Sequence, residues 1–177
     1  LVSAPVSYNT SSNFFSKLQT IEFLSLIASA AGAIGINKPI LCNGANLAYR
    51  RKVFLEKNQY STDDKASGDD VFLLHNIKQY YNHSILFAKN LDALVLTDPK
   101  KSFTDFFNQR LRWSSKSVHY RDFDTIFVSM LVFVTNLLVV ISAICLMFES
   151  IYTDELISMI VLKFIVDFIF LVPILFF

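Results

Sequence analysis

The chain has 177 residues, which leaves room for about one domain of ordinary size. Over half of its residues are apolar and 18 are phenylalanine, more than a soluble domain of this length readily buries, so a membrane protein is favoured. The formal net charge is only +1 and no long basic run is present, which excludes the charge pattern of a nucleic-acid-binding protein. We expect no nucleic-acid partner.

The first part of the chain is predicted to contain a strand, a helix and a turn. Residues 1–6 have the composition of a strand, and Asn13 can cap a helix that continues through the uncharged stretch 23–36 and ends at Pro39. This stretch is shorter than the ~20 residues that cross a bilayer, so a buried or interfacial helix is expected. A turn at 43–46 and a helical segment from Arg50 follow.

The middle of the chain is predicted to alternate between helices and strands. A helix begins at Asp69, because the apolar residues after it fall on one helical face. Two short strands follow at 85–88 and 93–97, and Pro99 is expected to open another helix. This order indicates a mixed α/β segment.

The last part of the chain is predicted to be a membrane domain, residues 122–177, after an α/β part at 1–121. Residues 125–148 carry no charge and are long enough to span a bilayer. A second span is expected at 156–177, where Lys163 and Asp167 are spaced to pair on one helix face. An internal ion pair is the favoured interpretation, and a polar lining of a translocation path is the alternative.

The charges on either side of the first span predict its orientation. Basic residues precede the span, whereas the loop after it carries only acidic ones, so the α/β part is expected in the cytosol. Residues 103–123 mix aromatic and basic side chains, which suits a helix at the membrane surface. An integral membrane protein of a plasma or inner membrane is therefore expected.

Three motifs follow one another in a fixed order: CNGANLAYRR at 42–51, SGDDVFLL at 67–74 and QRLRW at 109–113. Their order and spacing resemble the acceptor half of family-2 glycosyltransferases, the group of cellulose, chitin, hyaluronan and poly-N-acetylglucosamine synthases. The resemblance covers about residues 1–120. It implies an α/β fold: the second half of a GT-A (nucleotide-diphospho-sugar transferase) domain, followed by transmembrane helices.

The acidic pair Asp69 and Asp70 is the candidate catalytic site. A carboxylate beside the acceptor can take the proton from the attacking hydroxyl as the new glycosidic bond forms. The resemblance implies that Asp70 is this base, while Asp69 stands where the family more often has glutamate. Taken alone, two aspartates that cap a helix would be the simpler interpretation. The presence of QRLRW downstream reverses that preference.

The QRLRW motif supplies candidates for binding both substrates. An indole face such as that of Trp113 suits the apolar face of a sugar ring, and the guanidinium of Arg110 or Arg112 can neutralise a diphosphate leaving group. The resemblance implies that Gln109, Arg112 and Trp113 are the motif members and that Trp113 stacks on the acceptor. A basic and aromatic belt at the membrane boundary is the alternative.

The segment Asn43, Gly44, Ala45 and Asn46 matches a signature that, by resemblance, lets the backbone approach the donor and acceptor sugars. By itself it would be an ordinary turn. Cys42 borders the acceptor in this resemblance, although a packed thiol is the alternative.

No metal site is expected within the chain. Family members hold Mg or Mn through an Asp-x-Asp upstream of the Asn-Gly-Ala-Asn segment, and residues 1–41 contain no aspartate. The Asp122-Phe123-Asp124 sequence fits the letters, but it follows QRLRW, so we interpret it as an interfacial loop. The three histidines lack ligand spacing. The nucleotide-binding half and its cation are thus expected outside this chain, which begins without a signal peptide and is taken as part of a longer protein.

Together these expectations describe an inverting hexosyltransferase at the cytosolic membrane face. It would move a sugar from a nucleotide diphosphate, UDP in particular, to a polysaccharide or lipid acceptor, and the chain alone would be inactive. Whether an accessory subunit takes part is open. The alternative is a non-catalytic membrane subunit that retains a glycosyltransferase-like fold; a transporter is disfavoured because two spans are too few for a path.

Overall fold

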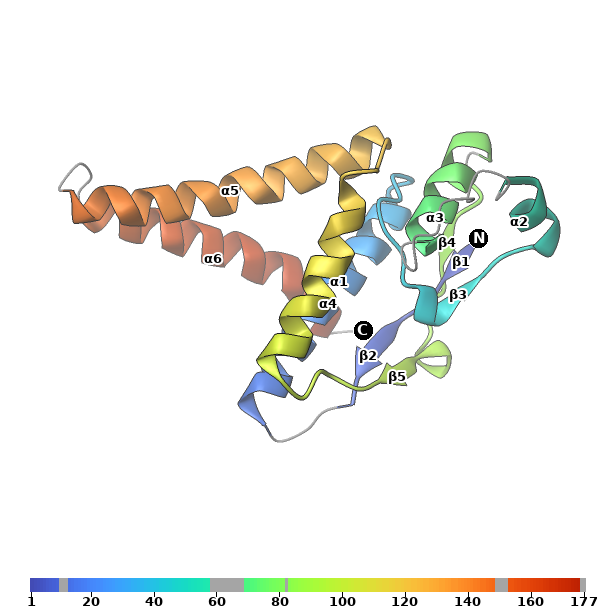
Figure 1. The fold of residues 1–177 in the computed structure, drawn as a ribbon, viewed down its shortest axis with the longest axis horizontal. Helices are drawn as coiled ribbons and strands as arrows, with labels where there is room; N and C mark the ends of the chain where they lie inside the picture. The colour runs from blue at the N-terminus through green and yellow to red at the C-terminus, as the bar shows by residue number, and fades with distance from the viewer. Residues whose placement is uncertain (10–12, 58–68, 82, 149–152, 176–177) are drawn as a thin grey trace. The chain divides into compact units, whose positions relative to one another are not determined.

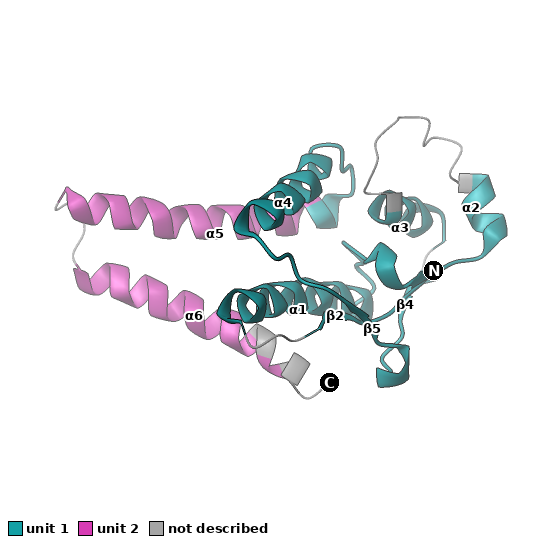
Figure 2. Ribbon diagram, turned by 60° about the horizontal axis from the view of Figure 1, so that its bottom comes forward, with its two compact units in different colours: residues 1–125 teal, residues 126–177 magenta. Residues whose placement is uncertain are grey.

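The computed structural model describes residues 1–9, 13–57, 69–81, 83–148 and 153–175. The chain divides into two compact units, residues 1–125 and 126–177, which are coloured separately in Figure 2. We predicted a boundary after Arg121, and the division falls shortly after it, inside an apolar helix. Unit 1 contains both helices and strands, and what the structure describes of unit 2 is helical. The chain is therefore of mixed α/β type with long apolar helices at its end.

Unit 1 contains two small sheets (Figure 1). In the first, β1 (Val2–Ser3) lies between β3 (Leu47–Ala48), to which it is antiparallel, and β4 (Leu86–Phe87), to which it is parallel. In the second, β2 (Val6–Tyr8) pairs in parallel with β5 (Val95–Thr97). Parallel pairing requires a crossover between the strands, and here helices of unit 1 lie in the intervening sequence.

The predicted first strand is divided at Ala4 and Pro5. Proline has no backbone N–H to donate to a ladder, so a break at this point is expected on physical grounds. The N–H of Ala4 instead donates to the carbonyl of Asn46 at 3.1 Å, and the carbonyl of Pro5 accepts from the N–H of Val95 at 3.1 Å. The two halves of the segment consequently belong to different sheets. The strands predicted at 85–88 and 93–97 are present in shorter form.

Helix α1 (Phe14–Gly35) begins where it was predicted, because the side chain of Asn13 accepts a hydrogen bond from the N–H of Phe15 at 3.0 Å. It ends before Pro39, since Asn37 adopts a left-handed φ of 58° and stops the helix. One face of α1 packs on β2 and β4, and Phe23, Ile27, Ala30 and Ile34 on that face are buried. The uncharged stretch therefore belongs to a helix with one buried face, and its last residue, Ile36, lies just beyond the end of that helix.

Helix α3 (Asp69–Tyr80) begins at the acidic pair, as predicted, and provides much of the core of unit 1. Leu73, Leu74 and Ile77 are buried in a cluster with Cys42 and Ile85. Two turns of 3₁₀ helix, η1 (Gly44–Asn46) and η2 (Leu91–Ala93), and helix α2 (Arg51–Lys57) complete this part. The first turn of α3 is thus anchored by the apolar residues that follow it in the helix and are buried in this cluster.

Helix α4 (Phe103–Ser117) carries the QRLRW motif and begins later than predicted. Pro99 does not open the helix, because the buried side chain of Gln19 on α1 bonds both the N–H and the carbonyl of Lys100, each at 2.9 Å. Helix α4 therefore begins only after Ser102. That residue caps α4 by accepting from the N–H of Asp105 at 3.1 Å.

Helix α5 (Phe123–Met147) and helix α6 (Thr153–Leu175) cover most of the two spans predicted at 125–148 and 156–177, and the last two residues of the second span lie outside the described residues. Within the described residues, α5 is long and apolar enough to cross a membrane, and so is α1, one face of which is buried within unit 1. In unit 2, Ser142 donates to the sulfur of Met159 at 3.5 Å. Lys163 and Asp167 on α6 form the predicted ion pair, with Nζ and Oδ2 2.5 Å apart. Large apolar side chains on both helices are exposed.

Candidate functional site

The structure brings Asp70 together with the Asn-Gly-Ala-Asn segment. The N–H of Gly44 donates to Oδ2 of Asp70 at 2.7 Å, and the N–H of Val71 donates to Oδ1 at 2.9 Å. Both carboxylate oxygens are therefore oriented by backbone amides at the start of α3. Asp69 begins the same helix, but its side chain lies outside the described part of the structure.

Gly44 has a geometric reason to be glycine. A Cβ built on it would stand 3.1 Å from Oδ2 of Asp70 and 3.4 Å from its Cβ, which is tighter than ordinary van der Waals contact. The absence of a side chain lets the η1 backbone approach the carboxylate and donate to it. The backbone approach that the resemblance implied for sugars is here directed at the candidate base.

The two asparagines of the segment hold its conformation. Oδ1 of Asn43 accepts from the N–H of Ala45 at 2.9 Å and starts the η1 turn. Nδ2 of Asn46 donates to the carbonyls of Pro5 at 2.8 Å and Ala93 at 2.6 Å. Asn46 therefore ties η1 to the ends of the neighbouring strands, whereas Ala45 is exposed.

Cys42 directly precedes this segment, and its thiol is buried. Its Sγ donates to the backbone carbonyl of Asp70 at 3.3 Å, and its side chain packs in the core cluster with Leu73 and Leu74. Burial raises the pKa of Cys42 strongly, and the charge of Asp70 raises it further. The thiol stays protonated, which makes it a packing residue and not a nucleophile.

Tyr120 lies close to Asp70 and was not singled out from the sequence. Its ring makes edge contacts with Phe72 and His75, with centroids 5.5 and 5.2 Å apart. Burial raises the pKa of Tyr120 to about 12, and the charge of Asp70 raises it further. A lone aromatic residue after a helix gives no sequence signal, so only the fold could reveal this neighbour.

The QRLRW residues lie along α4 in different environments. Arg110 is half-buried, forms an ion pair with Glu22 of α1, and donates from Nη1 to Oε1 of Gln109 at 2.7 Å. Arg112 is exposed and makes no side-chain hydrogen bond or ion pair with the residues that the structure describes. Trp113 is partly buried against Phe23. No hydrogen bond or ion pair among the described residues joins Asp70 to this motif.

A polar network of His75, Asp122 and Thr125 joins α3 to the first residues of α5. The hydroxyl of Thr125 donates to Oδ2 of Asp122 at 2.8 Å or to the carbonyl of Ile40 at 3.1 Å, and it lies 2.9 Å from Nε2 of His75. A proton on Nε2 satisfies this arrangement, with His75 donating to the hydroxyl of Thr125 at 2.9 Å or to the carbonyl of Ile40 at 3.2 Å. Burial lowers the pKa of His75, although its bond to Ile40 and the charge of Asp122 act in the opposite direction.

Lys78 of α3 closes the same network by contacting two carboxylates. Its Nζ lies 2.8 Å from Oδ1 of Asp122 and 2.7 Å from Oδ2 of Asp124, and Lys38 adds a longer contact to Asp124 at 3.5 Å. Burial alone would raise the pKa of Asp122, but hydrogen bonds from Lys78 and Thr125 outweigh it and leave the pKa below its usual value. The Asp122-Phe123-Asp124 sequence is thus part of an ion-pair network.

The residues of the described part do not provide a place for a divalent cation. No group of three or more of its His, Cys, Asp and Glu side chains is arranged to hold a metal, and Asp122 and Asp124 already share Lys78. Carboxylates that face an ammonium group cannot also coordinate a cation without displacing it. The prediction that the metal ligands lie outside this chain remains a prediction.

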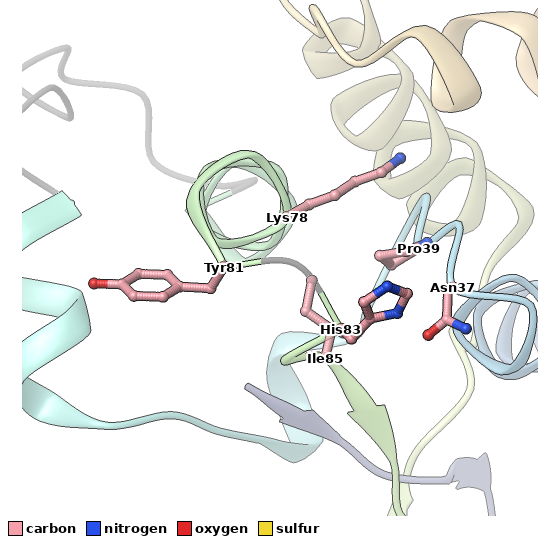
Figure 3. A pocket seen from close by; sticks show the side chains of 6 residues that line it. All are labelled: Asn37, Pro39, Lys78, Tyr81, His83 and Ile85. Atoms are coloured by element: carbon pink, nitrogen blue, oxygen red, sulfur yellow. The ribbon is translucent and has the colours of Figure 1, made fainter.

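A small pocket opens beside the end of α3 (Figure 3). Lys78 and Tyr81 extend from this end in different directions, and His83 lies near Asn37. The volume is about 20 Å³, which accommodates about one water molecule and no sugar ring. We therefore do not assign this pocket a substrate. Its lining residues are Asn37, Pro39, Lys78, Tyr81, His83 and Ile85.

Residues 1–177 match the family model described as "Glycosyl transferase family group 2". No curated protein and no solved structure matches the chain significantly. The family match extends over the α/β elements of unit 1 and the apolar helices of unit 2.

Proposed function

The chain belongs to glycosyl transferase family group 2, and from this premise we propose that it forms the acceptor-side half of an inverting transferase with a GT-A fold. The enzyme moves a hexosyl group from a nucleotide diphosphate, UDP in the first instance, to a hydroxyl of a polysaccharide or lipid acceptor. The family match supports glycosyl transfer in general. The donor, the acceptor and the inversion are our proposal.

The observation that carries the proposal is the contact between Asp70 and Gly44. It joins two of the three motifs, and two backbone amides at 2.7 and 2.9 Å fix the carboxylate at the start of α3. A general base must be held within reach of the proton that it removes, and a carboxylate oxygen retains further lone pairs after accepting one hydrogen bond. Asp70 would take the proton of the acceptor hydroxyl while that oxygen attacks the anomeric carbon from the side opposite the diphosphate.

The exposed part of QRLRW would bind the other reacting groups. The guanidinium of Arg112 is exposed, so its fork of donors can meet phosphate oxygens as negative charge develops on the leaving diphosphate. Gln109 would help Arg112 to steady the diphosphate as it leaves, and the partly exposed face of Trp113 would contact the acceptor sugar. We assign no step to a metal, because the described residues do not form a site for one.

We also propose that the chain is an integral membrane protein with unit 1 in the cytosol. Helix α5 has the length and composition of a membrane span, and its apolar side chains are largely exposed, which a hydrocarbon environment would satisfy. The basic residues that precede α5 favour the cytosolic side by the positive-inside rule. Helix α6 would be a second span whose Lys163 and Asp167 neutralise each other.

The test compares Asp70→Asn with a matched exposed aspartate in membranes that contain the protein carrying this chain. Asp92 is the control, since its side chain is exposed and makes no hydrogen bond or ion pair with the described residues. Transfer from radiolabelled UDP-glucose and UDP-N-acetylglucosamine, with Mg and Mn each supplied, is measured at equal protein level. We expect Asp70→Asn to lower transfer by at least about 10²-fold and Asp92→Asn to retain the parent rate.

Two outcomes would count against the proposal. Parent-level transfer by Asp70→Asn would reduce Asp70 to a helix cap. If nucleotide sugars bind but the parent transfers neither label, and no other UDP- or GDP-sugar is consumed, the chain is a non-catalytic membrane subunit with a transferase fold.

A further inference from the structure

Arg110 is held by a carboxylate from another helix. Its Nε donates to Oε1 of Glu22 on α1 at 2.7 Å, and its Nη2 contacts Oε2 of the same residue. This is the two-point geometry in which a planar guanidinium matches a carboxylate. Only 18% of the Arg110 side chain is exposed, so the pair is more shielded from water than an ordinary surface ion pair.

The same guanidinium contacts two predicted members of the QRLRW motif. Its carbon lies 4.3 Å from the ring centroid of Trp113, and Nη1 donates to Gln109 at 2.7 Å. It also lies 4.4 Å from the ring of Phe106, one helical turn before. Arg110 therefore links Trp113, which is proposed to contact the acceptor, and Gln109 to the body of unit 1.

Trp113 is supported from the core as well. Its ring lies tilted against Phe23, with centroids 6.4 Å apart, and Phe23 in turn stacks on Tyr8 at 4.4 Å. Phe23 and Glu22 are neighbours on α1, so one short segment of α1 supports both the indole and the arginine that covers it.

Three of the five N–H groups of Arg110 are engaged: those of Nε and Nη2 face Glu22 and one on Nη1 faces Gln109. The side-on fork of Nε and Nη2 could therefore bind a phosphate only if Glu22 were displaced. Burial would lower the pKa of Arg110, but the hydrogen bonds and charge of Glu22, with a contribution from Tyr8, keep it above its usual value. The positive charge of Arg110 is thus balanced by the carboxylate of Glu22.

We infer that Arg110, anchored by Glu22, is a positioning residue that fixes Trp113 and Gln109, and that it does not bind the leaving diphosphate. This assigns Glu22 a role that no motif indicated and leaves Arg112 as the arginine of QRLRW available to phosphate. The consequence for catalysis rests on the proposed function, whereas the positioning of Trp113 can be measured without it.

The chain contains a single tryptophan, so the fluorescence of the 177-residue chain in detergent reports on Trp113 alone. The variants are Arg110→Met and Glu22→Gln, and Arg112→Met on the same helix is the matched control. We expect Arg110→Met to raise the acrylamide quenching constant of Trp113 about twofold and to lower its anisotropy, because the ring loses the group stacked on it. Glu22→Gln should change both in the same direction, and Arg112→Met should change neither.

A double variant tests whether Glu22 acts on Trp113 through its ion pair with Arg110. If Glu22 acts only through Arg110, Glu22→Gln combined with Arg110→Met should give the same quenching constant as Arg110→Met alone. Arg110→Lys should restore the parent value only in part, since an ammonium group lacks the planar fork. Parent-like quenching in both Arg110→Met and Glu22→Gln would overturn the inference, as would an equal change in Arg112→Met.

Steady-state kinetics of the protein carrying this chain separate the two arginines. Arg110→Met should raise KM for the acceptor about tenfold and leave KM for the nucleotide sugar at the parent value, and Arg112→Met should do the reverse. A rise in the nucleotide-sugar KM with Arg110→Met would show that Arg110 binds the donor and would overturn the inference. If the fluorescence changes occur while the parent transfers no sugar, the positioning of Trp113 stands and the proposed function fails.

Discussion

Replacing Lys78 with methionine removes the cation that Asp122 and Asp124 share while keeping a side chain of similar length. In the parent, Nζ of Lys78 lies 2.8 Å from one carboxylate and 2.7 Å from the other. The side chain of Lys78 is only 17% exposed, and those of Asp122 and Asp124 are 15% and 24% exposed. The variant would therefore leave two poorly solvated carboxylates facing each other, with only the exposed Lys38, 3.5 Å from Asp124, as a remaining cation.

The exposed fractions of these three side chains set the size of the expected loss in unfolding free energy. Removing one partner of a buried ion pair costs about 3–5 kcal/mol of unfolding free energy, and the residual exposure of all three groups places this case lower, at about 2–3 kcal/mol. For a chain of this size, such a loss lowers the unfolding midpoint by about 5–10 °C. Because Lys78 joins α3 to the start of α5, the loss should appear in the unfolding of unit 1.

The assay is thermal unfolding of the 177-residue chain in detergent, followed by the fluorescence of Trp113. Lys52→Met is the matched control, since Lys52 is 86% exposed and its ion pair with Glu56 is a loose i, i+4 contact at 3.9 Å. An exposed pair of this kind contributes about 0.5 kcal/mol or less. Equal midpoints for the two variants would refute the reasoning from burial.

The pH dependence gives the Lys78 prediction a second test. The pKa of Asp122 is lower in the folded protein than in the unfolded chain, so its pairing stabilises the fold above the unfolded pKa of about 4 and is lost as pH falls through the folded value. The midpoint difference between the parent and Lys78→Met should accordingly shrink between about pH 5 and pH 3. A difference that grows on acidification would contradict the assignment of the cation to Asp122.

Three further predictions concern Gly44, Thr125 and Cys42. In Gly44→Ala, the new Cβ would stand 3.1 Å from Oδ2 of Asp70 and displace the carboxylate, so transfer by the protein carrying this chain should fall about 10–100-fold at an unfolding midpoint close to the parent's. Thr125→Val removes the hydroxyl that contacts His75 and Asp122 and should lower the unfolding free energy by about 1–3 kcal/mol in calorimetry. Burial raises the pKa of Cys42, so iodoacetamide at pH 8 should modify it at least about 100-fold more slowly in the folded chain than in urea.

Each of these changes has a control within the chain. Gly32→Ala adds its Cβ into open space on α1 and should leave transfer unchanged; an equal loss there would remove the steric explanation. Thr135 is exposed and bonds only its own helix, so Thr135→Val should be nearly neutral, and a comparable loss would count against the network at Thr125. Labelling of Cys42 is followed in a Cys145→Ser chain. Equal rates in the folded and unfolded states would show that the thiol is accessible.

Local signals in the sequence were sufficient where the physics is local. The cap at Asn13, the start of α3 at Asp69 and the pairing of Lys163 with Asp167 depend on residues within one or two turns, and all three are present. The two prolines, Pro39 and Pro99, do not mark the helix ends that we predicted from them. The end of α1 is fixed by the left-handed Asn37, and the start of α4 by the contact of Lys100 with Gln19.

The contacts that sequence could not provide join residues far apart in the chain. The ion pair of Glu22 with Arg110 and the network of Lys78 with Asp122 depend on how helices pack, and a charged residue on a helix gives no indication of its distant partner. The roles of Asp70, Arg112 and Trp113 remain predictions. The structure adds to them the amide contact of Asp70 with Gly44, which the motif alone did not reveal.

The parallel pairing of the strands has a consequence for synthesis. Val2 pairs with Leu86 and Val6 with Val95, so these two parallel pairings can form only after most of unit 1 has left the ribosome. Loop closure over such a separation is slow, and α1 keeps part of its apolar face without a sheet to cover it during that time. The apolar helix α5 emerges shortly afterwards. On our proposal that α5 spans a membrane, its delivery to a translocon would overlap in time with the folding of unit 1, and slowing translation beyond β5 should increase the yield of folded chain.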